Sequence, residues 1–176
     1  MISLVARLLR PSCQAGRIIE VSQVELLARG IEGLIVDLDN TITEWGRETM
    51  DEEVAGWLKQ AQDLGLRICL VSNNRGKRLA RIAEELGVPY IESATKPRRK
   101  AFRQAAELIG VGLQKTAVIG DQIFTDVLGG NRMGLYTILV APMSKREFVG
   151  TRLIRIPERA VLSWLRRSQS KEVRER

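Results

Sequence analysis

The chain has 176 residues, a formal net charge of +7 and no histidine. This length suits one domain with a sizeable hydrophobic core. The absence of histidine excludes a Ser-His-Asp triad, a histidine-based zinc site and phosphotransfer through histidine. Cys13 and Cys69 form no CxxC pair, so we expect no zinc knuckle, and isolated thiols are typical of a reducing compartment. No signal peptide is evident and no apolar stretch reaches about 18 residues, so we predict a cytoplasmic protein.

Helical and extended patterns alternate along the chain. We predict helices over residues 22–29, 51–64, 75–86, 97–109 and 125–132, and strands over residues 32–37, 66–71, 88–91, 116–119 and 135–140. Strands that alternate with helices indicate a mainly parallel sheet covered on both faces, which is a three-layer α/β/α, Rossmann-like fold. We divide the chain into a helical, amphipathic lead-in (1–30), an α/β core (31–144) and a basic C-terminal segment (145–176) that packs on the core or is partly disordered.

Two aspartates close the apolar strand at residues 32–37. Asp37 and Asp39 stand where ligands bind open α/β sheets, just beyond the carboxyl end of a strand. Alternation along a strand would send the two side chains opposite ways. If the chain leaves the strand at Leu38, both can face one pocket, where one attacks and the other moves a proton. The alternative is a strand with an ordinary Asp-rich cap.

The next two strands are also followed by polar groups. Ser72 follows the strand at 66–71, where its hydroxyl can bind a phosphoryl oxygen, and Asn73 comes directly after it. Alternatively, these residues simply cap the next helix. Lys96 stands before Pro97, which disfavours helix at the lysine, and it can place a point charge against phosphate. The alternative is a solvated lysine.

A third acidic segment follows the strand at 116–119. Gly120 permits close approach of the backbone, and Asp121 would reach the same pocket as Asp37. Asp126 can bind a metal or hold Asp121 in place. Mg²⁺ prefers hard oxygen ligands and is typically held by one or two carboxylates plus substrate phosphate. The alternative is an ordinary turn, because Asp and Gly are common turn residues.

The order of these motifs resembles the haloacid dehalogenase superfamily of phosphatases over about residues 30 to 140. The motifs are DxDxT at 37–41, Ser72, Lys96 and GDxxxTD at 120–126. The resemblance implies that Asp37 is the nucleophile that forms an aspartyl-phosphate, and that Asp39 is the general acid and base.

The resemblance also implies a ligand set. Ser72 and Lys96 would hold the phosphoryl group, and we add Asn73 as a further candidate. Mg²⁺ would bind Asp37, the backbone carbonyl of Asp39, and Asp121, with Asp126 as a ligand or as support. Gln122 follows Asp121 where many superfamily members have a second aspartate. We therefore assign the support of the metal to Asp126 instead.

The spacing of the motifs leaves no room for a lid. Only one helix and one strand fit between Asp39 and Ser72, and again between Ser72 and Lys96. This resembles the capless branch, subfamily IIIA, and within it the YqeG group, through GLIVDLDNT, LVSNN, TKPRRKAF and VIGDQIFTDVLGGNRMG. That group is related to mitochondrial phosphatases that act on phosphatidylglycerophosphate. The resemblance therefore implies a Mg²⁺-dependent phosphomonoester hydrolase for a large or lipid phosphate; the alternatives are a phosphoprotein, a nucleotide or another soluble phosphomonoester.

The positive charge gathers at the C-terminal end, in residues 145–176. This segment, with a predicted helix at 157–167, and an apolar start at residues 2–9 suit peripheral contact with an anionic membrane on its inner face. The alternatives are a start that packs on the sheet and a solvated tail. A non-catalytic protein that binds RNA or a ribosomal particle would use only the basic surface, and a receiver-like signalling domain would have no use for Asp39.

Overall fold

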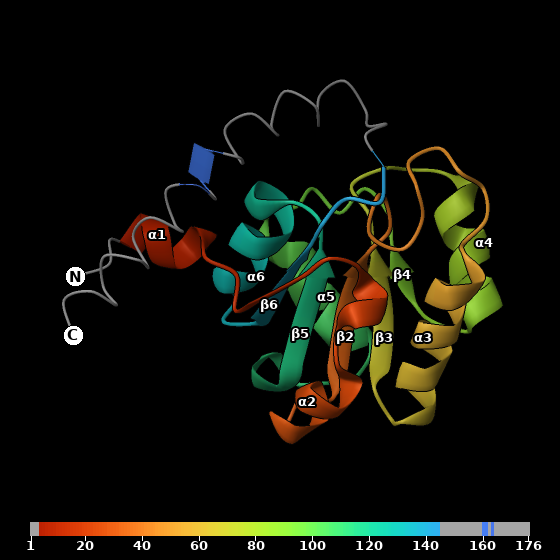
Figure 1. The fold of residues 1–176 in the computed structure, drawn as a ribbon, viewed down its shortest axis with the longest axis horizontal. Helices are drawn as coiled ribbons and strands as arrows, with labels where there is room; N and C mark the ends of the chain where they lie inside the picture. Colours follow the sequence, from red (N-terminus) through yellow and green to blue (C-terminus); the bar gives the residue numbers. More distant parts are fainter. Residues whose placement is uncertain (1–3, 145–159, 162, 164–176) are drawn as a thin grey trace.

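Figure 1 shows the computed structural model, which describes residues 4–144, 160, 161 and 163. Its centre is a six-stranded parallel sheet with the strand order β1-β6-β5-β2-β3-β4. The strands are β1 (Cys13–Ala15), β2 (Gly33–Asp37), β3 (Arg67–Val71), β4 (Tyr90–Ile91), β5 (Thr116–Gly120) and β6 (Tyr136–Val140). The helices are α1 (Leu4–Leu9), α2 (Gln23–Ala28), α3 (Glu52–Asp63), α4 (Lys77–Leu86), α5 (Arg99–Leu108) and α6 (Leu128–Asn131), with short helical turns η1 (Ile18–Glu20), η2 (Leu113–Lys115) and η3 (Ile123–Val127).

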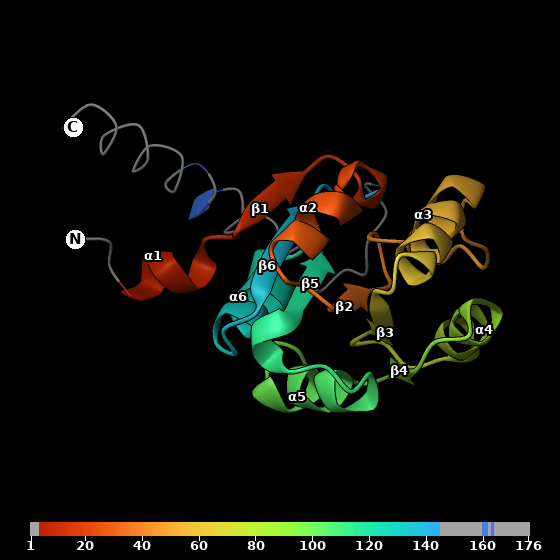
Figure 2. The same ribbon diagram turned by 90° about the horizontal axis from the view of Figure 1, so that it is seen from below.

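Helices cover both faces of the sheet, as Figure 2 shows for α2 and α3 on one side and α5 on the other. The side chains of β2 explain this arrangement because they alternate. Leu34 and Val36 belong to the core formed with α2, α3 and α4, whereas Ile35 packs with α5. The predicted three-layer α/β/α fold with a mainly parallel sheet is confirmed. Between Asp39 and Lys96 the chain forms only α3, β3, α4 and β4, so no cap domain is inserted there.

The register of the central strands decides where the site lies. Asp37 at the end of β2 stands opposite Val71 at the end of β3, and Val36 stands opposite Ile119 of β5. Because the strands are parallel, their carboxyl ends meet at one edge of the sheet. The residues that follow β2, β3 and β5 are therefore neighbours in space.

The structure differs from the sequence prediction at one predicted helix and at one strand that was not predicted. The predicted helix at 125–132 is divided into a five-residue π-helical turn, η3, and the short helix α6. The strand β1 was not predicted, because Cys13–Ala15 is a short, largely exposed edge strand with no apolar run. It pairs with β6 and so joins the predicted lead-in to the sheet. The division into lead-in, core and basic segment stays a prediction.

The N-terminal helix α1 packs against the core through Ala6 and Leu9, while Leu4 and Val5 are exposed. Asn131 of α6 holds its end, since the side-chain amide donates to the carbonyls of residues 8 and 10 at 2.8 and 2.9 Å. Of the predicted helix at 157–167, residues 160, 161 and 163 are helical, and the rest lies outside the described residues. In the part of the chain that the structure describes, no helix is long and apolar enough to cross a membrane.

Phe102 of α5 provides a test of the packing under the sheet. Its ring is fully buried against Gly129, where an added Cβ would overlap the ring. Phe102→Ala should lower the free energy of unfolding by about 3–5 kcal/mol, because it leaves a cavity in a close-packed core. Leu108→Ala on the same helix removes a half-exposed side chain and should change it by no more than about 0.5 kcal/mol. Urea unfolding of both variants would contradict this packing if their losses were equal.

Candidate active site

A tight turn at the end of β2 brings two aspartates to the same edge. The Leu38 carbonyl accepts hydrogen bonds from the backbone N–H groups of Ile42 and Thr43, at 3.1 and 3.3 Å. Asn40 has a φ of 60°, a left-handed conformation that asparagine tolerates better than most residues. The chain thus leaves the strand after Asp37, which meets the condition set by the sequence analysis, and Asp39 does not continue the strand alternation.

Lys96 is buried between two carboxylates. Its Nζ lies 2.5 Å from Asp37 Oδ1 and 2.7 Å from Asp126 Oδ1, and it donates a third hydrogen bond to the Val71 carbonyl at 3.2 Å. The side chain of Lys96 is only 3% exposed. Thr41 Oγ1 donates to the other oxygen of Asp37 at 3.2 Å. Because unpaired buried charges are costly, these contacts fix all three charged groups in place.

Asn73 ties the loop after β3 to the loop that contains Lys96. Its Oδ1 accepts from the backbone N–H of Lys96 at 2.7 Å, and its Nδ2 donates to the Lys96 carbonyl at 3.3 Å. The Asn73 side chain therefore positions the lysine backbone. Its predicted contact with phosphate stays a prediction.

The buried charges shift one another's pKa values. The pKa of Asp37 is raised to about 6, because burial and the charge of Asp126, which raise it, outweigh the contacts with Lys96 and Thr41, which lower it. Burial lowers the pKa of Lys96, but the charges of Asp126 and Asp37 outweigh burial and raise it above its ordinary value. At neutral pH Lys96 is therefore a cation and Asp37 is ionised.

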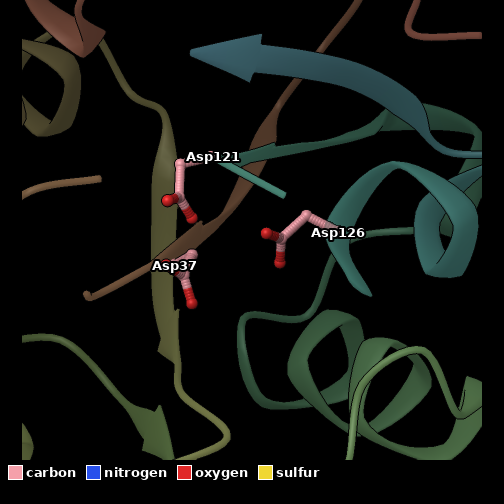
Figure 3. Close-up of side chains that lie close together, drawn as sticks. All are labelled: Asp37, Asp121 and Asp126. Carbon is pink, nitrogen blue, oxygen red and sulfur yellow. The ribbon is translucent and has the colours of Figure 1, made fainter. Parts of the chain in front are cut away.

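Asp121 completes an acidic cluster with Asp37 and Asp126. Figure 3 shows the three side chains, which come from the ends of β2 and β5 and from η3. All three are buried, and one carboxylate oxygen of each lies within 4.8 Å of the others. Three hard oxygen donors this close together fit a divalent cation such as Mg²⁺. The predicted part of the Asp39 backbone carbonyl in this set stays a prediction.

Gly120 and the π-helical turn place Asp126 in the cluster. A Cβ at Gly120 would overlap the Asp126 carboxyl group, so the glycine leaves the space that this carboxylate fills. Asp126 Oδ2 also accepts from the backbone N–H of Gln122 and from Thr125 Oγ1, both at 3.2 Å. π-Helical turns are frequent at functional sites, and here the wider turn positions an acidic side chain.

Asp39 lies in a separate network with Ser72. Asp39 Oδ2 accepts from Ser72 Oγ at 3.3 Å and from Asn74 Nδ2 at 2.8 Å, and Asp39 Oδ1 forms an ion pair with Arg78 in the first turn of α4. The sequence reasoning missed Asn74 and Arg78. Asn74 could have been found from the sequence, because it belongs to the polar run that follows β3. Nothing in the sequence distinguishes Arg78 from the other charged residues of its helix.

Comparison with known proteins assigns the chain to a family. Residues 7–134 match the sequence profile of the haloacid dehalogenase-like hydrolases. The chain belongs to this family. The probable phosphatase YqeG of Bacillus subtilis is 40% identical to this hydrolase over 150 residues, which cover 85% of the chain and 87% of that protein. The predicted enzyme class, a phosphatase of the haloacid dehalogenase type, is thereby confirmed.

A more distant relative and a solved structure extend the comparison. The chloroplastic phosphatidylglycerophosphate phosphatase 1 of Chlamydomonas reinhardtii is 29% identical over 146 residues, which are 76% of this hydrolase but only 53% of that protein. The hydrolase thus spans about half the length of this relative. The cobalt-bound deoxy-D-mannose-octulosonate 8-phosphate phosphatase of Haemophilus influenzae superposes with a TM-score of 0.51 and 20% identity, covering 64% of this chain and 69% of that chain. This likeness shows a common fold.

The raised pKa of Asp37 predicts how metal binding by this hydrolase depends on pH. Below about pH 6 the carboxylate is protonated, so a divalent cation must displace a proton to bind it. The apparent affinity for Mg²⁺ should fall by up to about tenfold per pH unit below about pH 6 and level off above about pH 7. Calorimetric titration of the metal-free protein measures this. In Asp37→Asn binding should be weak with little pH dependence, and equal wild-type affinities at about pH 5 and about pH 8 would contradict the prediction.

Proposed function

We propose that this hydrolase is a Mg²⁺-dependent phosphomonoesterase that works through an aspartyl-phosphate at Asp37. The observation that supports this best is the buried Lys96 ammonium, shared between Asp37 and Asp126 next to Asp121. An anionic nucleophile meets an anionic phosphate ester in this chemistry, so the pocket must supply positive charge. A cation fixed against the nucleophile satisfies part of that requirement.

In the first step an oxygen of Asp37 attacks the phosphorus atom. The bond from phosphorus to the ester oxygen breaks, and Asp39 gives a proton to the departing alcohol oxygen. In the second step Asp39 takes a proton from water, and the hydroxide attacks the aspartyl-phosphate, releasing inorganic phosphate and restoring Asp37. Contacts with Thr41 and Lys96 orient the Asp37 carboxylate before the attack.

The described residues offer one clear place for Mg²⁺. The carboxylates of Asp37, Asp121 and Asp126 would hold the ion, and when bound it supplies positive charge that offsets the charge of the transferring phosphoryl group. We assign binding of the phosphoryl oxygens to Ser72 and Lys96, and for this Lys96 would exchange one of its three present hydrogen bonds for a phosphoryl oxygen. Gln122 supports the set through its backbone N–H group, which holds Asp126.

We propose a lipid phosphate such as phosphatidylglycerophosphate as the substrate class. Support comes from the name of the algal relative and from a site that has no cap between Asp39 and Lys96. Leu4 and Val5 of α1 are 72% and 62% exposed beside the exposed Arg7, which suits peripheral contact with an anionic membrane. A phosphoprotein, a nucleotide or another soluble phosphomonoester remains the alternative substrate.

The two aspartates of the turn should differ in their effects. Asp37→Asn should abolish release of phosphate, because the amide is a poor nucleophile, and Asp39→Asn should lower kcat by roughly 10²–10⁴-fold through loss of proton transfer. Steady-state phosphate release measures both. Asp63→Asn, an exposed residue at the end of α3, is the matched control and should keep wild-type rates. Full activity in Asp37→Asn would overturn the mechanism.

A comparison of substrates tests the lipid assignment. Phosphatidylglycerophosphate in mixed micelles is offered with Mg²⁺ beside a panel of soluble phosphomonoesters and a phosphopeptide, with Asp37→Asn as the blank. We expect kcat/KM to be highest for the lipid. Turnover of only the soluble compounds or the phosphopeptide would leave the chemistry in place and reject the lipid assignment.

A further inference from the structure

Arg78 is a cation of the site to which the mechanism above gives no role. Its side chain is 15% exposed, and one guanidinium nitrogen forms the ion pair with Asp39 Oδ1. The other terminal nitrogen donates to the carbonyls of Glu44 and Arg47, at 3.3 and 3.2 Å. Arg78 therefore joins α4 to the loop after β2 and at the same time touches the proposed proton donor.

Lys96 and Arg78, the two cations of the site, differ in how many N–H groups they have left to bind a further anion. The Lys96 ammonium has three N–H groups, and contacts with Asp37, Asp126 and the Val71 carbonyl account for all three. A guanidinium has five N–H groups, and the contacts of Arg78 within the described residues account for three. Arg78 can therefore bind a further anion and keep its hold on the loop.

Asp39 does not depend on Arg78 alone. Its Oδ2 accepts from Asn74 at 2.8 Å and from Ser72 at 3.3 Å, so the carboxylate stays in place if the guanidinium turns to another anion. Because Asp39 is proposed to protonate the departing oxygen, Arg78 lies on the side of the leaving group. Lys96 contacts the nucleophile and Asp126 instead.

The start of α4 is basic. Its first turn contains no acidic residue and has Lys77 beside Arg78. Helices ordinarily favour acidic residues there, because the N-terminal end of a helix is the positive end of its dipole. In its described contacts Arg78 is paired with the acidic Asp39, and the basic start of the helix favours a further anion beside it.

We propose that Arg78 is a specificity-determining residue that binds a second anionic group on the leaving group of the substrate. The substrate class is a phosphomonoester whose alcohol part has a phosphodiester or carboxylate near the ester oxygen. This inference rests on the proposed function, since it uses Asp39 as the proton donor. The phosphodiester of a lipid headgroup and that of a soluble compound share this chemistry.

The test compares two soluble substrates that differ in the second anion. Glycerol 3-phosphate has none, whereas deacylated phosphatidylglycerophosphate has a phosphodiester on its leaving group. The wild type should prefer the second compound. Arg78→Gln should lower kcat/KM for it by about ten- to a hundredfold more than for glycerol 3-phosphate, mainly through KM, and Arg78→Lys should recover part of the loss. Intact phosphatidylglycerophosphate in micelles distinguishes a lipid from a soluble source.

Arg81→Gln is the matched control. Arg81 lies on the same helix, is 45% exposed and pairs with Glu48 at 3.0 Å, so it fastens the same loop without touching Asp39. Its substrate preference should equal that of the wild type. Equal losses on both substrates in Arg78→Gln and Arg78→Lys, or the same change of preference in Arg81→Gln, would overturn the inference while glycerol 3-phosphate turnover upholds the proposed function. Turnover that survives Asp37→Asn would reject both.

Discussion

The buried cation of Lys96 is the interaction on which the rest of the site depends. Transferring an ammonium and two carboxylates from water into a protein interior costs several kcal/mol for each ion, and only close pairing offsets that cost. The Lys96 loop must therefore reach Asp37 at the end of β2 and Asp126 in η3 together. The Asn73 side-chain amide fixes the position of this loop, because it hydrogen-bonds to both the backbone N–H and the carbonyl of Lys96.

The same pairing supports the proposed role of Asp37 in attack on a phosphate ester. Burial raises its pKa and Lys96 limits the shift, so that the pKa lies at about 6 and the carboxylate is ionised at neutral pH and yet poorly solvated. A nucleophile with little water around it loses little hydration as it attacks. The three acidic side chains of the cluster also repel one another, which favours a bound cation over a metal-free state.

The sequence was sufficient for the positions of Asp37, Ser72 and Asp121, because each follows an apolar strand and parallel strands share one carboxyl edge. It was sufficient for a mainly parallel sheet but not for β1, whose pairing with β6 depends on tertiary contact of an exposed segment. The π-helical turn was also beyond the reach of periodicity. The residue pattern of these five positions fits an α-helix equally well. The wider turn becomes evident only from the structure, where Asp126 packs against Gly120.

Arg78 was beyond sequence reasoning for a different reason. A charged residue in a charged helix is ordinarily solvated, and its spacing from Asp39 depends on how α4 sits over the loop after β2. That placement matters more here than in an enzyme with a lid. A capped phosphatase can contact the leaving group from the cap, whereas this chain has no cap between Asp39 and Lys96. Within the described residues, the rim of the sheet where α4 begins carries Arg78 in an ion pair with Asp39, the proposed proton donor, and this is where the leaving group can be selected.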